Sequence, residues 1–179
     1  YVTGNGRLTL SQSDAGASVV TVNQNSDYEF SGTADESSIN NGNNAGATRP
    51  LSFVKNGSGT WTLSGTNNTY HGPTTVNGGA LRITGKVLNS AVSIMNGARF
   101  SGHGGVVQSL SLASNSVFSV AVNGAATEQT TVLNTVTIAA GAKLTTQGDY
   151  SRSVNVAILT ATGGIPGSFA TEGLPPDVQ

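Results

Sequence analysis

Residues 55–65 of the chain read Lys55-Asn56-Gly57-Ser58-Gly59-Thr60-Trp61-Thr62-Leu63-Ser64-Gly65. Within this stretch, residues 60–63 alternate polar and apolar side chains, which is the pattern of a half-buried β-strand. The Asn-Gly pair ending at Gly57 predicts a tight turn, because both residue types tolerate the positive φ that such turns require. A turn followed by a short alternating strand is the unit from which we expect the rest of the fold to be built.

The same unit recurs along the chain at a nearly constant interval. Its turns fall at Gly57, Gly78, Gly97, Ser116 and Gly141, which lie 21, 19, 19 and 25 residues apart. Repetition at this period indicates a solenoid, and no window shows the apolar spacing of a helix. We therefore predict an all-β right-handed parallel β-helix, in which each coil stacks on the next. An antiparallel β-sandwich, which also has many short strands, is the rival architecture.

Alternation within each unit also predicts which side chains point into the β-helix. Strand neighbours point to opposite faces, so every second residue of an apolar run is a core candidate. The predicted inward residues are Leu63, Val76, Leu81, Ile83, Val92, Ile94, Phe100, Leu110, Leu112, Phe118, Val120, Val136, Ile138 and Leu144.

The composition excludes several classes of protein. Of the 179 residues, 9% are charged and 24 are glycine, cysteine is absent, and about a third are Ser, Thr or Asn. A net charge of −1 with scattered basic residues gives no footprint for nucleic acid, so no nucleic-acid partner is expected. The lack of cysteine excludes disulfide scaffolds and thiolate metal sites. In stacked coils, rows of like charge would repel, whereas Ser, Thr and Asn side chains can form ladders.

Residues 55–65, together with Thr69-Tyr70-His71-Gly72-Pro73-Thr74-Thr75-Val76-Asn77-Gly78-Gly79-Ala80-Leu81, resemble the passenger-associated transport repeat of autotransporters, the type V secretion proteins of Gram-negative bacteria. One departure is an additional residue between Gly65 and Tyr70, where we expect the turn to bulge. The resemblance implies that a folding and transport role falls on Lys55, Gly57, Gly59, Thr60, Trp61, Leu63, Gly65, Tyr70, Gly72, Val76, Gly78, Gly79 and Leu81.

Residues 157–170 are similar to the segment that closes many passengers shortly before the linker helix and membrane barrel. Together the two resemblances imply the C-terminal, autochaperone end of a passenger, which emerges first and templates the coils that follow. They also imply a protein displayed on the bacterial surface or secreted, after passage through the periplasm and outer membrane. The expected partners are the chain's own upstream coils and its own barrel, which we expect outside this sequence.

The chain divides into coils over residues 1–172 and a Pro-containing tail over 173–179, with the transport repeat at 53–85. Residues 31–49 are polar and rich in Gly and Asn, and we expect them to form a surface loop between coils, with a recognition loop as the alternative. Pro cannot donate to a strand ladder, so the tail is expected to leave the β-helix. A hairpin just before it is expected to cap the exposed strand edges.

Side chains capable of chemistry are few. We expect His71 and His103 to lie in surface turns and Asp35-Glu36 to belong to a solvated loop, with no metal, cofactor or catalytic residue in the segment. Asp27 and Glu29 share a strand face and are the best enzymatic candidate, although no basic or substrate-stacking partner accompanies them in the sequence. Trp61 is expected to be buried, packed on Tyr70 or over its coil, in preference to an exposed sugar-stacking role.

Three hypotheses for function follow. The first is a non-catalytic folding and stability segment of an autotransporter passenger. The second is an adhesin-type surface that binds host or bacterial partners or associates with itself, as a surface protein involved in virulence would. The third and weakest is a β-helix enzyme that cleaves polysaccharides. The resemblance implies that the active part of the complete passenger lies N-terminal to this region.

Overall fold

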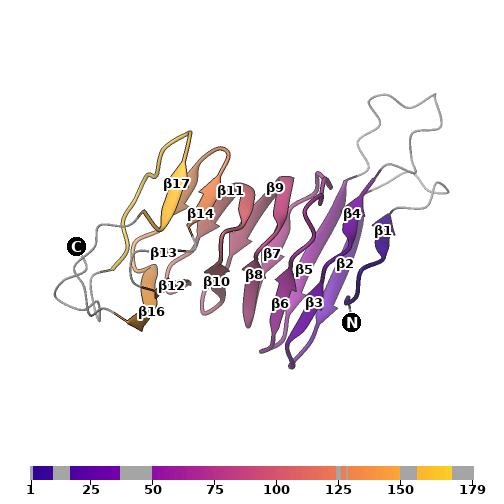
Figure 1. Cartoon of the computed structure of the whole chain (residues 1–179), viewed down its shortest axis with the longest axis horizontal. Coiled ribbons are helices and arrows are strands. Elements are labelled where there is room, and N and C mark those ends of the chain that lie inside the picture. The colour runs from indigo at the N-terminus through magenta and orange to yellow at the C-terminus, as the bar shows by residue number, and fades with distance from the viewer. Residues whose placement is uncertain are drawn as a thin grey trace.

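The structure, a computed structural model, describes residues 2–9, 17–36, 50–123, 126–127, 129–149 and 157–170. Within these ranges the regular structure is all β, in seventeen short strands stacked side by side along the longest axis of the molecule (Figure 1). The stack begins with the N-terminal strands and ends with β17 (Leu159–Ala161). None of the described residues belongs to a helix that could cross a membrane.

Most strands belong to two sheets that run the length of the stack. Sheet 1 has the order β17-β14-β11-β9-β7-β5-β2, with β15 also paired to β11. Its remaining members are β2 (Ser18–Asn23), β5 (Leu51–Asn56), β7 (Thr74–Val76), β9 (Lys86–Ile94), β11 (Val106–Leu112), β14 (Thr130–Val132) and β15 (Val136–Ile138).

Sheet 2 has the order β13-β12-β10-β8-β6-β3, with β16 also paired to β12. Its strands are β3 (Tyr28–Phe30), β6 (Thr60–Leu63), β8 (Ala80–Ile83), β10 (Arg99–Gly102), β12 (Val117–Asn123), β13 (Ala126–Thr127) and β16 (Lys143–Asp149). A small parallel sheet joins β1 (Arg7–Thr9) to β4 (Thr33–Asp35).

From β5 to β12 successive strands alternate between the two sheets, so each of these coils supplies one strand to each sheet and pairs with the coils on either side. Trp61 of β6 thus pairs with Leu81 of β8, which pairs with Phe100 of β10 and then Phe118 of β12. Among the described strands every pairing is parallel except β12 with β13. This topology confirms the parallel β-helix and excludes the antiparallel sandwich.

The core is a continuous column of side chains from adjacent coils. Thirteen of the fourteen predicted inward residues are buried, and Leu144 is partly buried against the same cluster. Period-two alternation therefore predicted the core well, because in a β-helix every coil has one face directed inward. Alternation did not identify Lys55, Asn68 and Thr74, whose polar side chains are also fully buried.

The coils turn where the repeat predicts, within one residue. Positive φ angles occur at Gly57, Gly79, Gly97, Asn115 and Gly141, so two of the five predicted turn positions, Gly78 and Ser116, are displaced by one residue. The displacement to Asn115 is physically reasonable, because asparagine tolerates the left-handed region better than serine.

An asparagine ladder runs along one of these corners. The Asn56 side-chain amide donates to Asn23 Oδ1 at 2.8 Å, and the Asn77 amide donates to Asn56 Oδ1 at 3.0 Å. Asn23 and Asn77 are exposed and Asn56 is half-buried, so uncharged amides link three successive coils at the solvent boundary. The predicted use of uncharged polar ladders in place of charge is confirmed at this corner.

Two predictions about irregular segments have a mixed outcome. Strand β4 lies within residues 31–49, so the beginning of the predicted loop is a strand; residues 37–49 lie outside the described residues. The antiparallel β12–β13 pair joins residues 122–127, and β17, further along the chain, pairs in parallel with β14. The tail from residue 171 lies outside the described residues, so the C-terminal hairpin cap stays a prediction.

Replacing Gly79 by alanine should destabilise the fold, whereas the same change at the adjacent Gly78 should not. Gly79 has φ +64°, and a Cβ there would lie 2.4 Å from the Gly59 carbonyl oxygen; at Gly78 the nearest atom is 3.4 Å away. We expect Gly79→Ala to lower the free energy of unfolding by at least about 1–2 kcal/mol, and Gly78→Ala by no more than about 0.5 kcal/mol. Guanidinium denaturation measures both values, and equal losses would contradict the assignment of the turn.

Candidate functional site

Two regions of the described structure concentrate candidate functional residues: two successive coils over residues 53–83, called the repeat coils below, and a groove on the outer face of sheet 2. The first repeat coil contains β5 and β6, and the second contains β7 and β8. Together they contain all thirteen residues that the repeat resemblance singles out.

Lys55 is the most unusual residue of the repeat coils. It pairs in register with Val22 on one side and Val76 on the other, so its side chain occupies an inward position in a column that is otherwise aliphatic. The side chain is fully buried, and Nζ donates to the carbonyl oxygens of Asn56 at 2.8 Å, Gly57 at 3.0 Å and Gly78 at 3.2 Å.

These three bonds match the three donors of an ammonium group, which is how a buried charge becomes tolerable. Burial lowers the pKa of Lys55, and the negative charge of Asp27 opposes part of that shift. Because Gly57 and Gly78 belong to the turns of adjacent coils, the ammonium joins two coils at their corner. Lys55 is therefore a clamp between turns.

Most glycines of the repeat coils lie where the backbone approaches the preceding coil. A Cβ added at any of five positions would approach an atom of another strand or turn within 1.9–2.4 Å. The five are Gly57, Gly59, Gly65, Gly72 and Gly79. Real Cβ atoms do not approach other atoms so closely, so these positions require glycine for coil spacing. Gly78 has no such close contact, so the structure gives no steric reason for that member of the predicted set.

Three aromatic rings pack together in the interior of the repeat coils. Phe53 lies between the other two, with its ring centroid 5.3 Å from that of Trp61 and 4.8 Å from that of Tyr70, the latter edge-to-face. Trp61 and Tyr70 are fully buried, which confirms the buried prediction for Trp61. The sequence suggested that Trp61 packs on Tyr70; in the structure Phe53 contacts both rings. Trp61 also donates its indole N–H to the Val2 carbonyl at 3.1 Å.

A buried chain of hydroxyl groups completes the coil interior. Tyr70 Oη lies 2.6 Å from Thr74 Oγ1, which lies 2.9 Å from Ser90 Oγ. Burial raises the pKa of Tyr70 to about 12, so the phenol stays protonated and available as a donor. Sequence analysis missed Thr74 and Ser90, because a serine or threonine in a strand looks the same whether it faces solvent or a buried partner.

Asn68 satisfies the backbone at the corner where a bulge was predicted. It is fully buried, and its Oδ1 accepts the Ala34 N–H at 3.0 Å. Its Nδ2 donates to the carbonyls of Gly65 at 2.9 Å and Lys86 at 3.0 Å. One amide thus connects three successive coils, and unpaired buried backbone groups at this turn are avoided.

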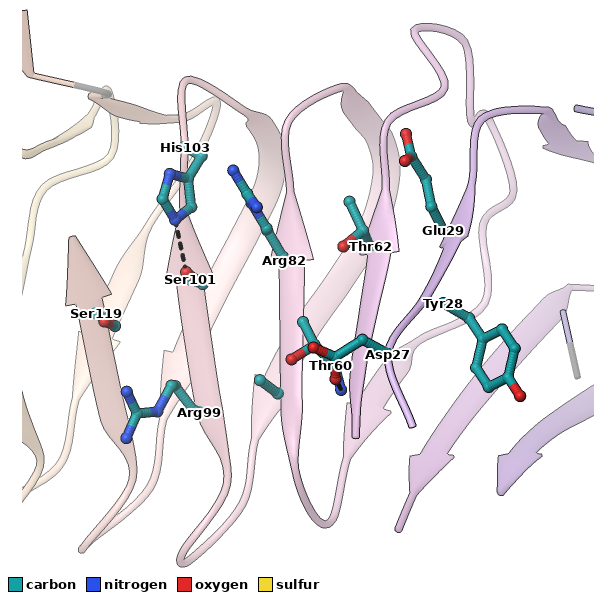
Figure 2. Close-up of a pocket in the computed structure, with 11 residues that line it drawn as sticks. Asp27, Tyr28, Glu29, Thr60, Thr62, Arg82, Arg99, Ser101, His103 and Ser119 are labelled. Atoms are coloured by element: carbon teal, nitrogen blue, oxygen red, sulfur yellow. Dashed lines mark hydrogen bonds between the residues drawn. The ribbon is translucent and has the colours of Figure 1, made fainter. Parts of the chain in front are cut away.

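The second region is an open groove of about 410 Å³ on the outer face of sheet 2. Because Trp61, Leu81, Phe100 and Phe118 point inward, the residues flanking each of them point outward and line the groove. Figure 2 shows Asp27 and Glu29 on the strand at one side of the groove and the basic side chains on strands further along the stack.

The basic side chains surround Ser101. In the parallel register, Ser101 pairs with Arg82 of β8 on one side and with Ser119 of β12 on the other. Arg99 and His103 lie two residues before and after Ser101, and His103 Nε2 is 2.9 Å from Ser101 Oγ. Burial lowers the pKa of His103, and the nearby charge of Arg82 lowers it further.

The groove corrects one statement made from the sequence. Asp27 and Glu29 do face the same side, as predicted, but the idea that no basic partner accompanies them is wrong. Arg82 and Arg99 lie more than fifty residues further along the chain, and only the stacking of coils brings them to the same face.

The carboxylates of Asp27 and Glu29 also hold the neighbouring coil. Asp27 Oδ1 accepts the Thr60 N–H at 2.7 Å, and Glu29 Oε1 accepts a hydrogen bond from Ser64 Oγ.

The acidic pair Asp35-Glu36 is also corrected, since neither residue belongs to a solvated loop. Asp35 is buried in β4 and forms a two-point ion pair with Arg7, at 2.9 and 3.0 Å. Glu36 accepts the backbone N–H groups of Leu51 at 2.7 Å and His71 at 2.9 Å.

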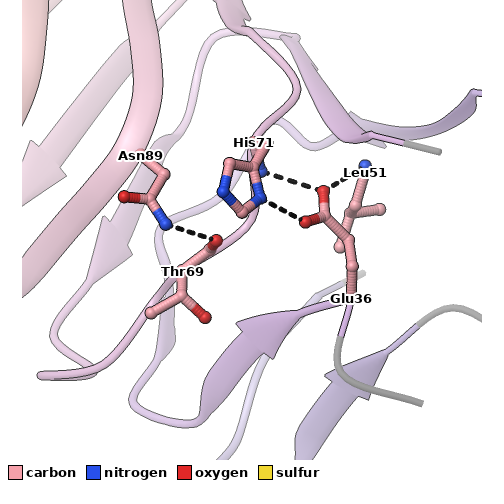
Figure 3. A network of polar contacts seen from close by, with 5 residues as sticks. All are labelled: Glu36, Leu51, Thr69, His71 and Asn89. Carbon is pink, nitrogen blue, oxygen red and sulfur yellow. Dashed lines mark hydrogen bonds and ion pairs between the residues drawn. The ribbon is translucent and has the colours of Figure 1, made fainter. Parts of the chain in front are cut away.

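The His71 ring joins this network, with Nδ1 2.6 Å from Glu36 Oε2 (Figure 3). His71 is exposed, as expected for a surface turn, and its contact with Glu36 spans thirty-five residues of sequence. No group of three or more His, Cys, Asp or Glu side chains that could hold a metal ion occurs in the described part of the chain.

The Lys55 clamp predicts a specific loss of stability. Lys55→Met keeps an unbranched side chain but removes the donors, leaving carbonyl oxygens buried without their partner. We expect the free energy of unfolding to fall by about 1–3 kcal/mol. Lys86→Met, at an exposed lysine, is the matched control and should change it by no more than about 0.5 kcal/mol. If Lys55→Met were as stable as Lys86→Met, the hydrogen bonds of Lys55 would not stabilise the fold.

His103 predicts a pH dependence of folding. Its pKa in the folded state is lower than the ordinary value of 6.5, so the unfolded chain binds the proton more readily. The free energy of unfolding should therefore fall as the pH is lowered through 6.5 toward the folded-state pKa, and this part of the slope should be absent in His103→Gln. Thermal denaturation of both proteins across that range measures the difference; identical slopes would contradict it.

Comparison with known protein families finds that residues 53–83 match the passenger-associated transport repeat. The match covers β6, β7, β8 and most of β5, and it includes Lys55, Phe53, Trp61 and Tyr70, the last of which lies between β6 and β7. Comparison with curated proteins and with solved structures found no match. This repeat family implies a secreted or surface-exposed protein. Residues 53–83 therefore match the passenger-associated transport repeat and lie within an all-β parallel β-helix.

Proposed function

We propose that this chain is a non-catalytic folding and stability segment, autochaperone-like in its role, of an autotransporter passenger displayed on the bacterial surface or secreted. The observation that carries the proposal is the interior of the transport repeat. Within residues 53–83 it combines the Lys55 clamp with the Phe53, Trp61 and Tyr70 rings, all of them buried.

The physical argument concerns nucleation. A single β-helix coil cannot bury its apolar face, so the first coils form at a cost in free energy and later coils add favourably to an existing stack. The two repeat coils lower that cost through contacts between residues that are close in sequence, such as Lys55 with Gly57 and Tyr70 with Thr74. Short loops close with less loss of entropy than long ones. The repeat coils are therefore suited to form early in folding.

Propagation would then proceed along open strand edges. Among the described residues, β2 is the last strand of sheet 1 and pairs on one side only, with β5. An unpaired strand edge is a template for another strand. We propose that upstream coils of the passenger, folding after this segment, pair at this end of the stack.

The absence of catalysis is part of the proposal. What supports it is that the best acid-base candidates, Asp27 and Glu29, each hold a group of the neighbouring coil through a carboxylate oxygen. A general acid or base must lie within hydrogen-bond reach of the reacting atoms of its substrate. In Asp27 and Glu29 a carboxylate oxygen is instead bonded to the neighbouring coil. The arrangement therefore favours a structural use of both side chains.

The folding role can be tested with a matched pair of core truncations. Phe53→Ala removes a ring inside the repeat, and Phe118→Ala removes an equally buried ring in β12, three coils further along the stack. Each should lower the free energy of unfolding by about 3–5 kcal/mol. If the repeat coils form early in folding, Phe53→Ala should mainly slow refolding, whereas Phe118→Ala should mainly speed unfolding. Stopped-flow fluorescence after dilution from guanidinium measures both rates.

The same variants carry the test to secretion. In the complete passenger, Phe53→Ala should yield protein that is exported poorly or is sensitive to external protease, and Phe118→Ala should have the smaller effect. Equal partition of both truncations between folding and unfolding rates would count against an early-forming repeat.

A second candidate function is a binding surface, and the groove on sheet 2 favours it. Opposite charges and hydroxyl groups line an open depression on the outer face, where a partner has access. Deleting the segment separates the two roles: failure of the passenger to fold supports the folding role, and a folded, exported passenger that no longer adheres supports the binding role.

A further inference from the structure

The outward positions of sheet 2 carry charge in a fixed order along the stack. The acidic residues Asp27 and Glu29 lie at the β3 end, and Arg82 and Arg99 lie on β8 and β10, two and three strands further on. Adjacent strands are about 4.8 Å apart, so the acidic and basic ends of the groove are separated by roughly 10–15 Å. Between them lie the hydroxyl groups of Thr60 and Thr62.

The arginines have donors available for a ligand. Arg99 is exposed, and among the side chains that the structure describes neither Arg82 nor Arg99 forms an ion pair. Arg82 Nε is buried and has no hydrogen-bond partner in the described structure. A buried polar group without a partner in a folded protein needs a specific explanation, and a bound anion is one.

The register places these donors around one point. Arg82 and Ser119 flank Ser101 on the neighbouring strands, and Arg99 precedes it by two residues on the same face of β10. Guanidinium groups bind carboxylates and other planar or tetrahedral oxyanions through paired hydrogen bonds. An anionic group over Ser101 would therefore lie between the two arginine side chains (Figure 2).

The acidic end restricts what can carry that anion. A nucleic-acid strand has a charge at every nucleotide, and its phosphates would meet Asp27 and Glu29. A saccharide with widely spaced anionic groups avoids this, because its neutral hydroxyl groups can donate to the carboxylates. Each carboxylate has about four lone-pair sites, and the bonds to Thr60 and Ser64 use only some of them.

We infer that this groove binds a sparsely charged acidic saccharide, with a carboxylate or sulfate group held by Arg82 and Arg99 and sugar hydroxyl groups directed toward Asp27 and Glu29. The inference names the ligand class for the groove of the proposed binding role and does not depend on the folding role. The shallow, open groove suits an extended chain that lies across the strands.

The test compares two ligands that differ only in charge. A hyaluronan oligosaccharide carries one carboxylate per disaccharide, and its carboxyl-reduced form is neutral. We expect the chain to bind the first and not the second by isothermal titration calorimetry. Arg82→Gln and Arg99→Gln should each weaken binding by about tenfold. A sulfated saccharide of similar spacing distinguishes a sulfate from a carboxylate preference.

Lys86→Gln is the matched control, since it removes one exposed positive charge outside the groove. It should change affinity by less than about twofold, because distant surface charges are screened by salt. Circular dichroism of all variants checks that the fold is kept.

Equal binding of the carboxyl-reduced form, or equal weakening by Lys86→Gln, would overturn the assignment. Tighter binding of single-stranded DNA through the same arginines would overturn the saccharide as ligand. Failure of the ligand class remains distinct from failure of the binding role. If the displayed protein adheres and the arginine variants abolish adhesion while no saccharide binds, the groove is a binding site for another class of ligand.

Discussion

Every feature of this protein depends on the parallel, in-register stacking of coils. Strands about 4.8 Å apart repeat the same position from coil to coil, so each side chain has a counterpart directly above and below it. Inward positions form aromatic and aliphatic columns, such as Trp61, Leu81, Phe100 and Phe118. At the corners the same repetition permits the ladder of Asn23, Asn56 and Asn77 without repulsion between like charges. The low charge of the chain is a consequence of this geometry.

The transport repeat shows how stacking is reinforced where the coils turn. Two buried polar side chains donate hydrogen bonds to backbone carbonyl groups at the corners, where the regular strand ladders end. Lys55 donates to three carbonyl groups of two adjacent turns, and Asn68 links Ala34, Gly65 and Lys86. Close approach of the same turns explains most of the glycines of the repeat. The repeat thus stabilises the packing of the corners, and the folding role that we propose rests on that packing.

The outer face of sheet 2 has a different character from the core, because stacking assembles it from residues far apart in sequence. Arg82, Arg99 and His103 meet Asp27 and Glu29 only after several coils have formed. The proposed folding and binding roles therefore use opposite faces of the same strands. Trp61 and Leu81 supply the interior, and Thr62 and Arg82, one residue further along, supply the groove. A change on the outer face can alter binding without removing the apolar contacts that hold the coils together.

The sequence by itself determined the features that depend on local pattern. Alternation predicted the inward residues from Leu63 to Ile138, and the Gly and Asn turns predicted the coil period to within one residue. Only the tertiary structure decided three other features. These are the burial of Lys55 and Thr74, the hydrogen bonds that Glu36 accepts from Leu51 and His71, and the charged groove. The physical reason is that burial of a polar side chain and proximity of two charges depend on which coil lies beside which. Alternation fixes the face of a side chain, and only the stacked register fixes its neighbours.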